Sequence, residues 1–93
     1  MDINNFTTVI ATLDNEFDTH KFIEKYYSTN EKEYVELLNS HIDSTNGIFK
    51  AAHAQIGRFL SSNSTSLKIQ KVNRGDSENI KKYDSENQIW RKL

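Results

Sequence analysis

The N-terminal part of the chain spaces its apolar residues with the period of an α-helix. Between residues 3 and 13 they recur at steps of three and four, as Ile3, Phe6, Val9, Ile10 and Leu13. This spacing places them on one face of a helix and leaves the polar residues on the other. We therefore predict an amphipathic helix over 3–13.

Two more helices are expected before residue 43. A short extended piece at 16–17 precedes a helix that either Asp18 or Thr19 caps and that runs to about Tyr27. A third helix follows Asn30, because Asn30 and Glu33 have the spacing of a capping box. The predicted buried face of this helix consists of Tyr34, Val35, Leu37, Leu38 and Ile42.

A turn at 43–47 leads into a fourth helix over about 48–61, with Asn46 or Thr45 as its cap. Its apolar stripe is Phe49, Ala52, Ile56, Phe59 and Leu60. Its other surface carries Lys50, His53, Ala54, Gln55, Arg58 and Ser61, and the helix contains no acidic residue. The face opposite the core is therefore basic and polar.

The C-terminal third favours strands. The polar run 61–66 ends the fourth helix, and 67–70 then alternates apolar and polar residues, which predicts a strand to 72 or 73. Residues 88–93 are rich in strand formers and are its expected antiparallel partner.

Between these two strands, Arg74-Gly75-Asp76 has the composition of a turn. The tetrapeptide Asp76-Ser77-Glu78-Asn79 recurs as Asp84-Ser85-Glu86-Asn87. We interpret the two copies as turns on either side of 80–83, itself a candidate short strand.

The composition fits one folded domain over residues 1–93. The chain is 35% hydrophobic and 11% aromatic, more apolar and aromatic than is typical of disordered segments. It has no cysteine, which excludes disulfides, thiolate zinc sites and a cysteine nucleophile. No apolar run approaches the ~20 residues of a membrane helix, and no basic cluster precedes an apolar stretch at the N-terminus, so we expect a cytoplasmic protein without a membrane partner.

The charges are polarised along the chain although the net charge is only −1. Residues 1–46 carry nine acids and three bases, whereas residues 47–93 carry nine bases and four acids. Such a domain can present its basic half to a polyanion, although an imbalance of solvated charges without a function explains the same numbers.

The expected fold is α+β and mainly helical, with four short helices followed by a C-terminal β-hairpin. This order, together with the basic fourth helix, resembles the winged helix-turn-helix superfamily. The resemblance covers residues 3–93 and includes no diagnostic motif. It implies that 48–61 is the helix that enters the DNA major groove and that 73–86 is the wing.

The residue types suit that role, since Gln and Arg form bidentate hydrogen bonds to adenine and guanine and basic residues contact phosphates. The candidate DNA-binding residues are Lys50, His53, Gln55, Arg58, Ser61, Lys68, Arg74, Lys81 and Lys82. Each has a simpler explanation. Side chains such as Gln55 and Arg58 on an amphipathic helix are most often only solvated, His53 is explained as a partly buried histidine, and the hairpin lysines as protection against edge pairing.

The motifs of common enzymes are missing. The sequence contains no phosphate-binding glycine loop, no G-x-S-x-G elbow and no His-x-x-x-His pair. His20 and Glu24 share a helical face, but one such pair is more typical of a surface hydrogen bond than of a metal site. We therefore expect a binding protein with no catalytic residue, no metal and no cofactor.

Two functions remain open. The first is DNA binding, with a homodimer formed through the N-terminal helix to read two half-sites. The alternative is a protein interaction module, an adaptor or an inhibitor, that uses the same basic surface on an acidic protein.

Overall fold

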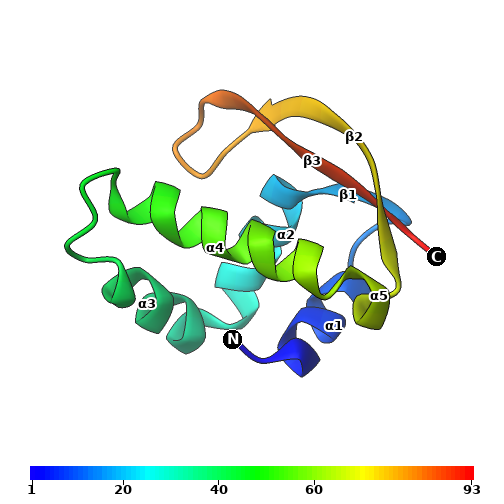
Figure 1. Cartoon of the computed structure of the whole chain (residues 1–93), viewed down its shortest axis with the longest axis horizontal. Coiled ribbons are helices and arrows are strands. Elements are labelled where there is room, and N and C mark those ends of the chain that lie inside the picture. The colour runs from blue at the N-terminus through cyan, green and yellow to red at the C-terminus, as the bar shows by residue number, and fades with distance from the viewer.

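The computed structural model describes all 93 residues as five helices and one three-stranded antiparallel sheet (Figure 1). The helices are α1 (Ile3–Ala11), α2 (Thr19–Thr29), α3 (Glu31–Ser40), α4 (Ile48–Ser62) and α5 (Ser64–Leu67). The strands are β1 (Glu16–Asp18), β2 (Ile69–Glu78) and β3 (Asp84–Lys92). The predicted α+β, mainly helical class is confirmed, with one additional helix and a third strand in the sheet.

The first two helices begin where the sequence predicts. The Asp2 carboxylate accepts a hydrogen bond from the Asn4 amide at 2.8 Å and caps α1. Asp18 caps α2 in the same way through the Lys21 amide, also at 2.8 Å. Both carboxylates satisfy amides that a first helical turn leaves free.

The capping box and part of the buried face predicted for α3 are wrong. The Asn30 side chain makes no capping bond, and the Glu33 carboxylate instead accepts hydrogen bonds from Tyr26 and Asn5. Val35 and Ile42 are 60% and 59% exposed. Because α3 packs against α2 and α4 on one side only, its periodicity buries just Tyr34 and Leu37.

The fourth predicted helix is confirmed as α4, and its start differs. Neither Asn46 nor Thr45 caps it, because the preceding residue is Gly47, whose φ of 96° is accessible to glycine at little cost. Three residues of its apolar stripe are buried at steps of four: Ala52, Ile56 and Leu60. Phe49, at the start of the stripe, is 37% exposed.

The sheet joins the two ends of the chain. The short piece predicted at 16–17 is strand β1, which pairs with β3 and places Phe17 opposite Trp90. The predicted pairing of 67–72 with 88–93 is confirmed from Ile69, which lies opposite Lys92, whereas Leu67 belongs to helix α5 and not to the strand. The strand order is β1-β3-β2, so β2 forms a free edge of the sheet.

The turns predicted inside the hairpin are wrong. Residues 74–76 lie within β2, opposite Gln88, Asn87 and Glu86. The two copies of the repeated tetrapeptide face each other across the strands, with Ser77 opposite Ser85, and 80–83 form the loop instead of a strand. The turn and strand predictions failed because these residues have low strand propensity, whereas contacts to α2, described below, hold them in the sheet.

The core lies between the helices and the inner face of the sheet. Phe6, Phe22 and Tyr26 are fully buried and form an aromatic cluster with ring centroids 4.8 to 5.8 Å apart. Trp90 adds the largest buried side chain from the sheet. No helix has the length and apolar character needed to cross a membrane. In Figure 1 the β2–β3 hairpin lies along one side of α4, and the candidate site lies between them.

Candidate functional site

A groove of about 760 Å³ lies between α4 and the β2–β3 hairpin, with residues of α2 among its lining. The α4 side includes the small residues Ala54 and Gly57, and the strand side includes Trp90. The side of α4 that was predicted to be basic and exposed therefore forms one wall of the groove and faces the hairpin.

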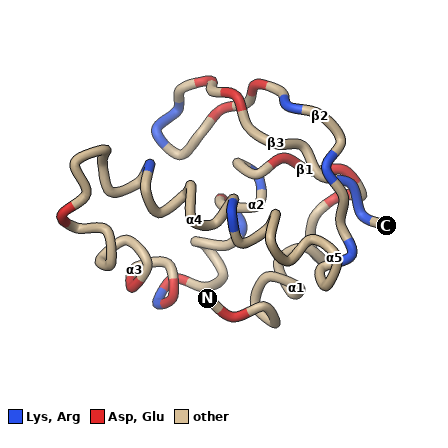
Figure 2. Tube along the Cα trace, in the orientation of Figure 1, with Lys and Arg blue, Asp and Glu red and all other residues tan.

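Basic residues of α4, β2 and the hairpin loop line this groove. Figure 2 marks the positions of the lysines and arginines along the Cα trace. Those that line the groove are Lys50 and Arg58 on α4, Lys71 and Arg74 on β2, and Lys81 in the hairpin loop. The single acidic residue of the lining is Glu86. The local excess of positive charge is thus much larger than the net charge of the chain suggests.

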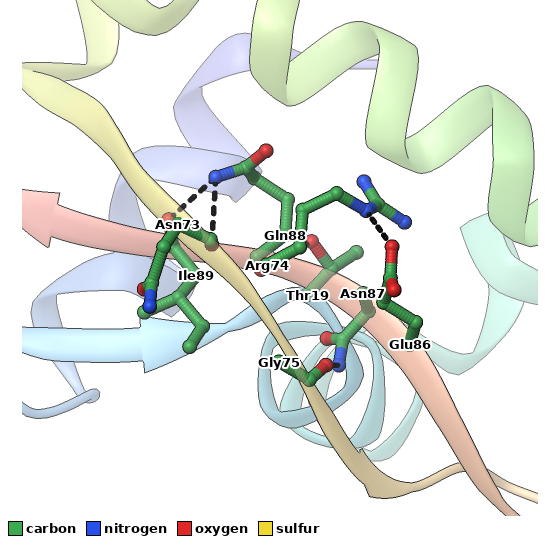
Figure 3. A network of polar contacts seen from close by, with 8 residues as sticks. All are labelled: Thr19, Asn73, Arg74, Gly75, Glu86, Asn87, Gln88 and Ile89. Atoms are coloured by element: carbon green, nitrogen blue, oxygen red, sulfur yellow. Dashed lines mark hydrogen bonds and ion pairs between the residues drawn. The ribbon is translucent and has the colours of Figure 1, made fainter.

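These five bases differ in how far they are already engaged. Arg74 is paired with Glu86 at 2.5 Å, and Figure 3 shows this ion pair on the hairpin. Lys81 places its ammonium 5.7 Å from the centroid of the Phe49 ring, where a cation–π contact ties the loop to the start of α4. Lys50, Arg58 and Lys71 form no ion pair. Three cations are therefore free to meet an anionic ligand.

The structure brings six of the nine candidate DNA-binding residues to this groove: Lys50, His53, Arg58, Ser61, Arg74 and Lys81. The other three lie elsewhere. Gln55 accepts a hydrogen bond from the His41 ring at 2.7 Å, Lys68 ends α5 with a left-handed φ of 57°, and Lys82 pairs with Glu78 at 3.5 Å. Lys71, which sequence reasoning did not select, lines the groove.

His53, in the wall of the groove, has a lowered pKa. Burial lowers its pKa to about 4, and His20 and Lys81 add to the effect by charge repulsion. Burial also raises the pKa of Tyr34 to about 12, so the phenol stays protonated, and its oxygen is hydrogen-bonded to His53 Nε2 at 2.7 Å. At neutral pH His53 is therefore uncharged and held in place.

A polar cluster that sequence reasoning missed anchors the hairpin to α2. His20 Nδ1 lies 3.1 Å from the Ser77 carbonyl and 2.8 Å from the Ser77 hydroxyl. Because a carbonyl oxygen only accepts, Nδ1 carries the proton in the neutral ring, and the Ser85 hydroxyl donates to Nε2 at 3.3 Å. The imidazole thus bridges both copies of the repeated tetrapeptide.

Asn87 completes this cluster and is buried. Its side-chain oxygen accepts from the His20 amide at 2.9 Å, in the first turn of α2, and its amide nitrogen donates to the Gly75 carbonyl at 3.1 Å (Figure 3). The repeated serines and asparagines were the only sequence signal for this cluster. That signal becomes interpretable only once the strand register is known.

Trp90 and Thr19 form a second link between sheet and helix. The indole N–H donates to the Thr19 hydroxyl at 3.1 Å, and this hydroxyl donates to the Gln88 carbonyl at 3.1 Å. Both polar groups of a buried pair are therefore satisfied. The hairpin is fixed to α2 at its base, while its loop reaches α4 through Lys81.

His20 and Glu24 also line a smaller pocket of about 140 Å³, together with His53 and Glu78. No three histidine, aspartate or glutamate side chains of the chain lie close enough together to hold a metal ion. The surface hydrogen bond expected between His20 and Glu24 is absent, because His20 binds the two serines.

The groove is a basic surface built from a helix and a hairpin. Comparison of the chain with known protein families, with curated proteins and with solved structures gave no match.

Proposed function

We propose that the protein is a DNA-binding protein and not an enzyme, with α4 in the major groove and the basic hairpin on the backbone. The observation that carries the proposal is the convergence of five basic side chains from α4, β2 and the hairpin loop on one groove. The element order that resembles the winged helix-turn-helix superfamily supports the same assignment.

The size of the groove suits one strand of a duplex. A space of about 760 Å³ accommodates a short stretch of sugar-phosphate backbone and excludes a whole duplex. When one sugar-phosphate strand occupies the groove, α4 lies on one side of that strand and the hairpin loop lies on the other. Lys50 and Arg58, eight residues apart on a helix that rises 1.5 Å per residue, span about 12 Å of that strand.

The free cations supply the affinity in this arrangement. Lys50, Arg58 and Lys71 have no carboxylate to give up, so each can displace a counterion from a phosphate. Arg58 is also the residue on α4 best suited to contact guanine. Gln55 is a weaker candidate for adenine, since its side-chain oxygen already accepts from His41.

The test is fluorescence anisotropy with a labelled duplex of random sequence. We expect Lys50→Glu with Arg58→Glu to weaken binding at least about tenfold, because two phosphate contacts become repulsive. The matched control is Lys25→Glu with Lys32→Glu, two exposed lysines outside the groove, which changes the net charge equally. Circular dichroism establishes that both variants are folded.

Equal loss in the two double variants would contradict the proposal, because binding would then depend on net charge alone. Absence of duplex binding combined with binding to a polyglutamate peptide would assign the same surface to an acidic protein.

A further inference from the structure

The free edge of β2 carries a charge arrangement that is incomplete within one chain. Asp76 lies directly opposite Glu86 on β3, so two carboxylates face each other across the strands. Glu86 is neutralised by Arg74, whereas Asp76 has no ion-pair partner. Like charges at directly opposed positions destabilise a sheet.

The hydrogen-bonding pattern of the hairpin places Asp76 and Glu86 in a closely spaced pair. The Asn79 amide donates to the Tyr83 carbonyl at 2.8 Å, which marks 79 and 83 as a hydrogen-bonded pair. Such pairs alternate with non-hydrogen-bonded ones along an antiparallel ladder. Asp76 and Glu86 therefore form a non-hydrogen-bonded pair, the type with the shorter separation between strands.

The same alternation of pairs leaves backbone groups without a hydrogen-bond partner on the outer edge of β2. The N–H and C=O groups of Arg74, Asp76 and Glu78 point away from β3, toward an edge that no other strand occupies. Along β2 the bases come first and the acids follow, as Lys71 and Arg74 and then Asp76 and Glu78. A second β2 running antiparallel would place bases opposite acids.

We propose that two copies of this chain pair through the free edges of β2, in the register that sets Gly75 opposite Gly75 of the second copy. Arg74 of each copy then lies opposite Asp76 of the other. Both Arg74–Asp76 positions are hydrogen-bonded pairs, which gives about four backbone bonds. The Arg74 guanidinium has enough donors to serve Glu86 and the new carboxylate together.

Charge selects this register from its neighbours. Hydrogen bonding requires that outward-pointing residues meet, so the register can shift only by two residues. One shift sets Asp76 opposite Asp76 of the second copy, and the other sets Arg74 opposite Arg74. Both shifts place like charges opposite each other at the two-fold axis that relates the two copies. Only the register centred on Gly75 pairs opposite charges without also placing like charges opposite each other.

The irregularities of β2 leave the pairing segment intact. A bulge interrupts β2 between Lys71 and Arg74, upstream of the residues that pair. A Cβ at Gly75 would lie 2.9 Å from Ile89 Cδ1, so a larger residue there would require the end of that side chain to move. A short paired segment buries less area than a standard interface, so the dimer is weak and depends on concentration.

The test is sedimentation equilibrium across a concentration series, with no nucleic acid present. We expect Arg74→Asp alone and Asp76→Arg alone each to weaken dimerisation about tenfold, because each variant opposes like charges with itself. An equimolar mixture of the two variants restores dimerisation. In the mixed pair one chain carries acids at both positions and the other carries bases at both, so opposite charges face each other again.

Asp84→Arg is the matched control, since it makes the same charge change as Asp76→Arg in the hairpin, on the inner strand β3. We expect it to dimerise as the unchanged chain does. A chain that remains monomeric at millimolar concentration would overturn the proposal, as would a mixture no more dimeric than its components. Neither result bears on DNA binding, which is measured separately.

Discussion

Individual residues in the groove show how burial decides whether a polar side chain is available to a ligand. His53 lies in the wall of the groove, yet its ring is hydrogen-bonded to Tyr34 and lies tilted against the Phe49 ring, with ring centroids 5.9 Å apart. Arg58, five residues further along α4, is exposed and unpaired. The sequence predicted both residues on one basic face. The contacts made by each side chain show that His53 is held in place and that Arg58 is free.

The pKa of His53 makes stability depend on pH. Because the folded state holds this pKa near 4, below the value of 6.5 in an unfolded chain, unfolding takes up a proton between these values. The contribution of His53 is therefore complete above pH 6.5 and is lost as the pH falls toward 4. After allowance for solvent screening of a partly exposed group, the loss is no more than about 2 kcal/mol.

The measurement is the free energy of unfolding of the unchanged chain and of His53→Gln at pH 7 and pH 4.5. Glutamine does not titrate, so the difference between the two proteins isolates His53 from the carboxylates that titrate in both. We expect the advantage of the unchanged chain to shrink at the lower pH. A difference independent of pH would show that His53 is not held neutral.

At the scale of elements, apolar periodicity was a good guide and polar sequence was not. The spacing of apolar residues predicted α1, α2 and α4 and the apolar half of the hairpin, because each of these elements buries its own stripe. It overestimated the buried face of the third helix, because Val35 and Ile42 follow the helical spacing and are nevertheless mostly exposed. A period indicates which residues share a face, and it does not say whether that face is covered.

The polar half of the hairpin could not be predicted because the cause of its structure lies elsewhere in the chain. Asp, Asn, Ser and Glu are typical of turns, and the repeated tetrapeptides were interpreted as turns. They form strands where His20 and Asn87 connect them to α2, more than 55 residues apart in sequence. The candidate site depends on this placement, since it brings Arg74 and Glu86 to the groove.

Asn87 tests that explanation. Asn87→Ala removes the acceptor for the His20 amide and the donor to the Gly75 carbonyl, so it should lower the free energy of unfolding by about 1–3 kcal/mol. Asn73→Ala is the control, since Asn73 is exposed on the same hairpin and only its backbone is hydrogen-bonded. It should cost less than about 0.5 kcal/mol. Similar costs at the two positions would mean that the cluster does not anchor the hairpin.

At the scale of the whole molecule, the charge segregation along the sequence becomes a segregation in space. The acidic α3 and the basic groove lie on different parts of the fold (Figure 2), so a near-neutral chain presents a strongly basic local surface. Linear counting predicted the basic half. It did not separate engaged cations from free ones, a distinction that requires the partners of Arg74 and Lys81.

Glu86 limits the positive charge of the groove, and removing its charge should strengthen DNA binding. Glu86→Gln frees Arg74, so the plot of log affinity against log salt concentration should steepen by about 0.9 for one added phosphate contact. Glu16→Gln is the matched control, because Glu16 is also a half-exposed partner of an arginine, Arg91, and lies outside the groove. Its salt slope should equal that of the unchanged chain. Equal slopes for all three proteins would show that Arg74 does not contact the ligand and would confine the phosphate contacts to the remaining bases of the groove.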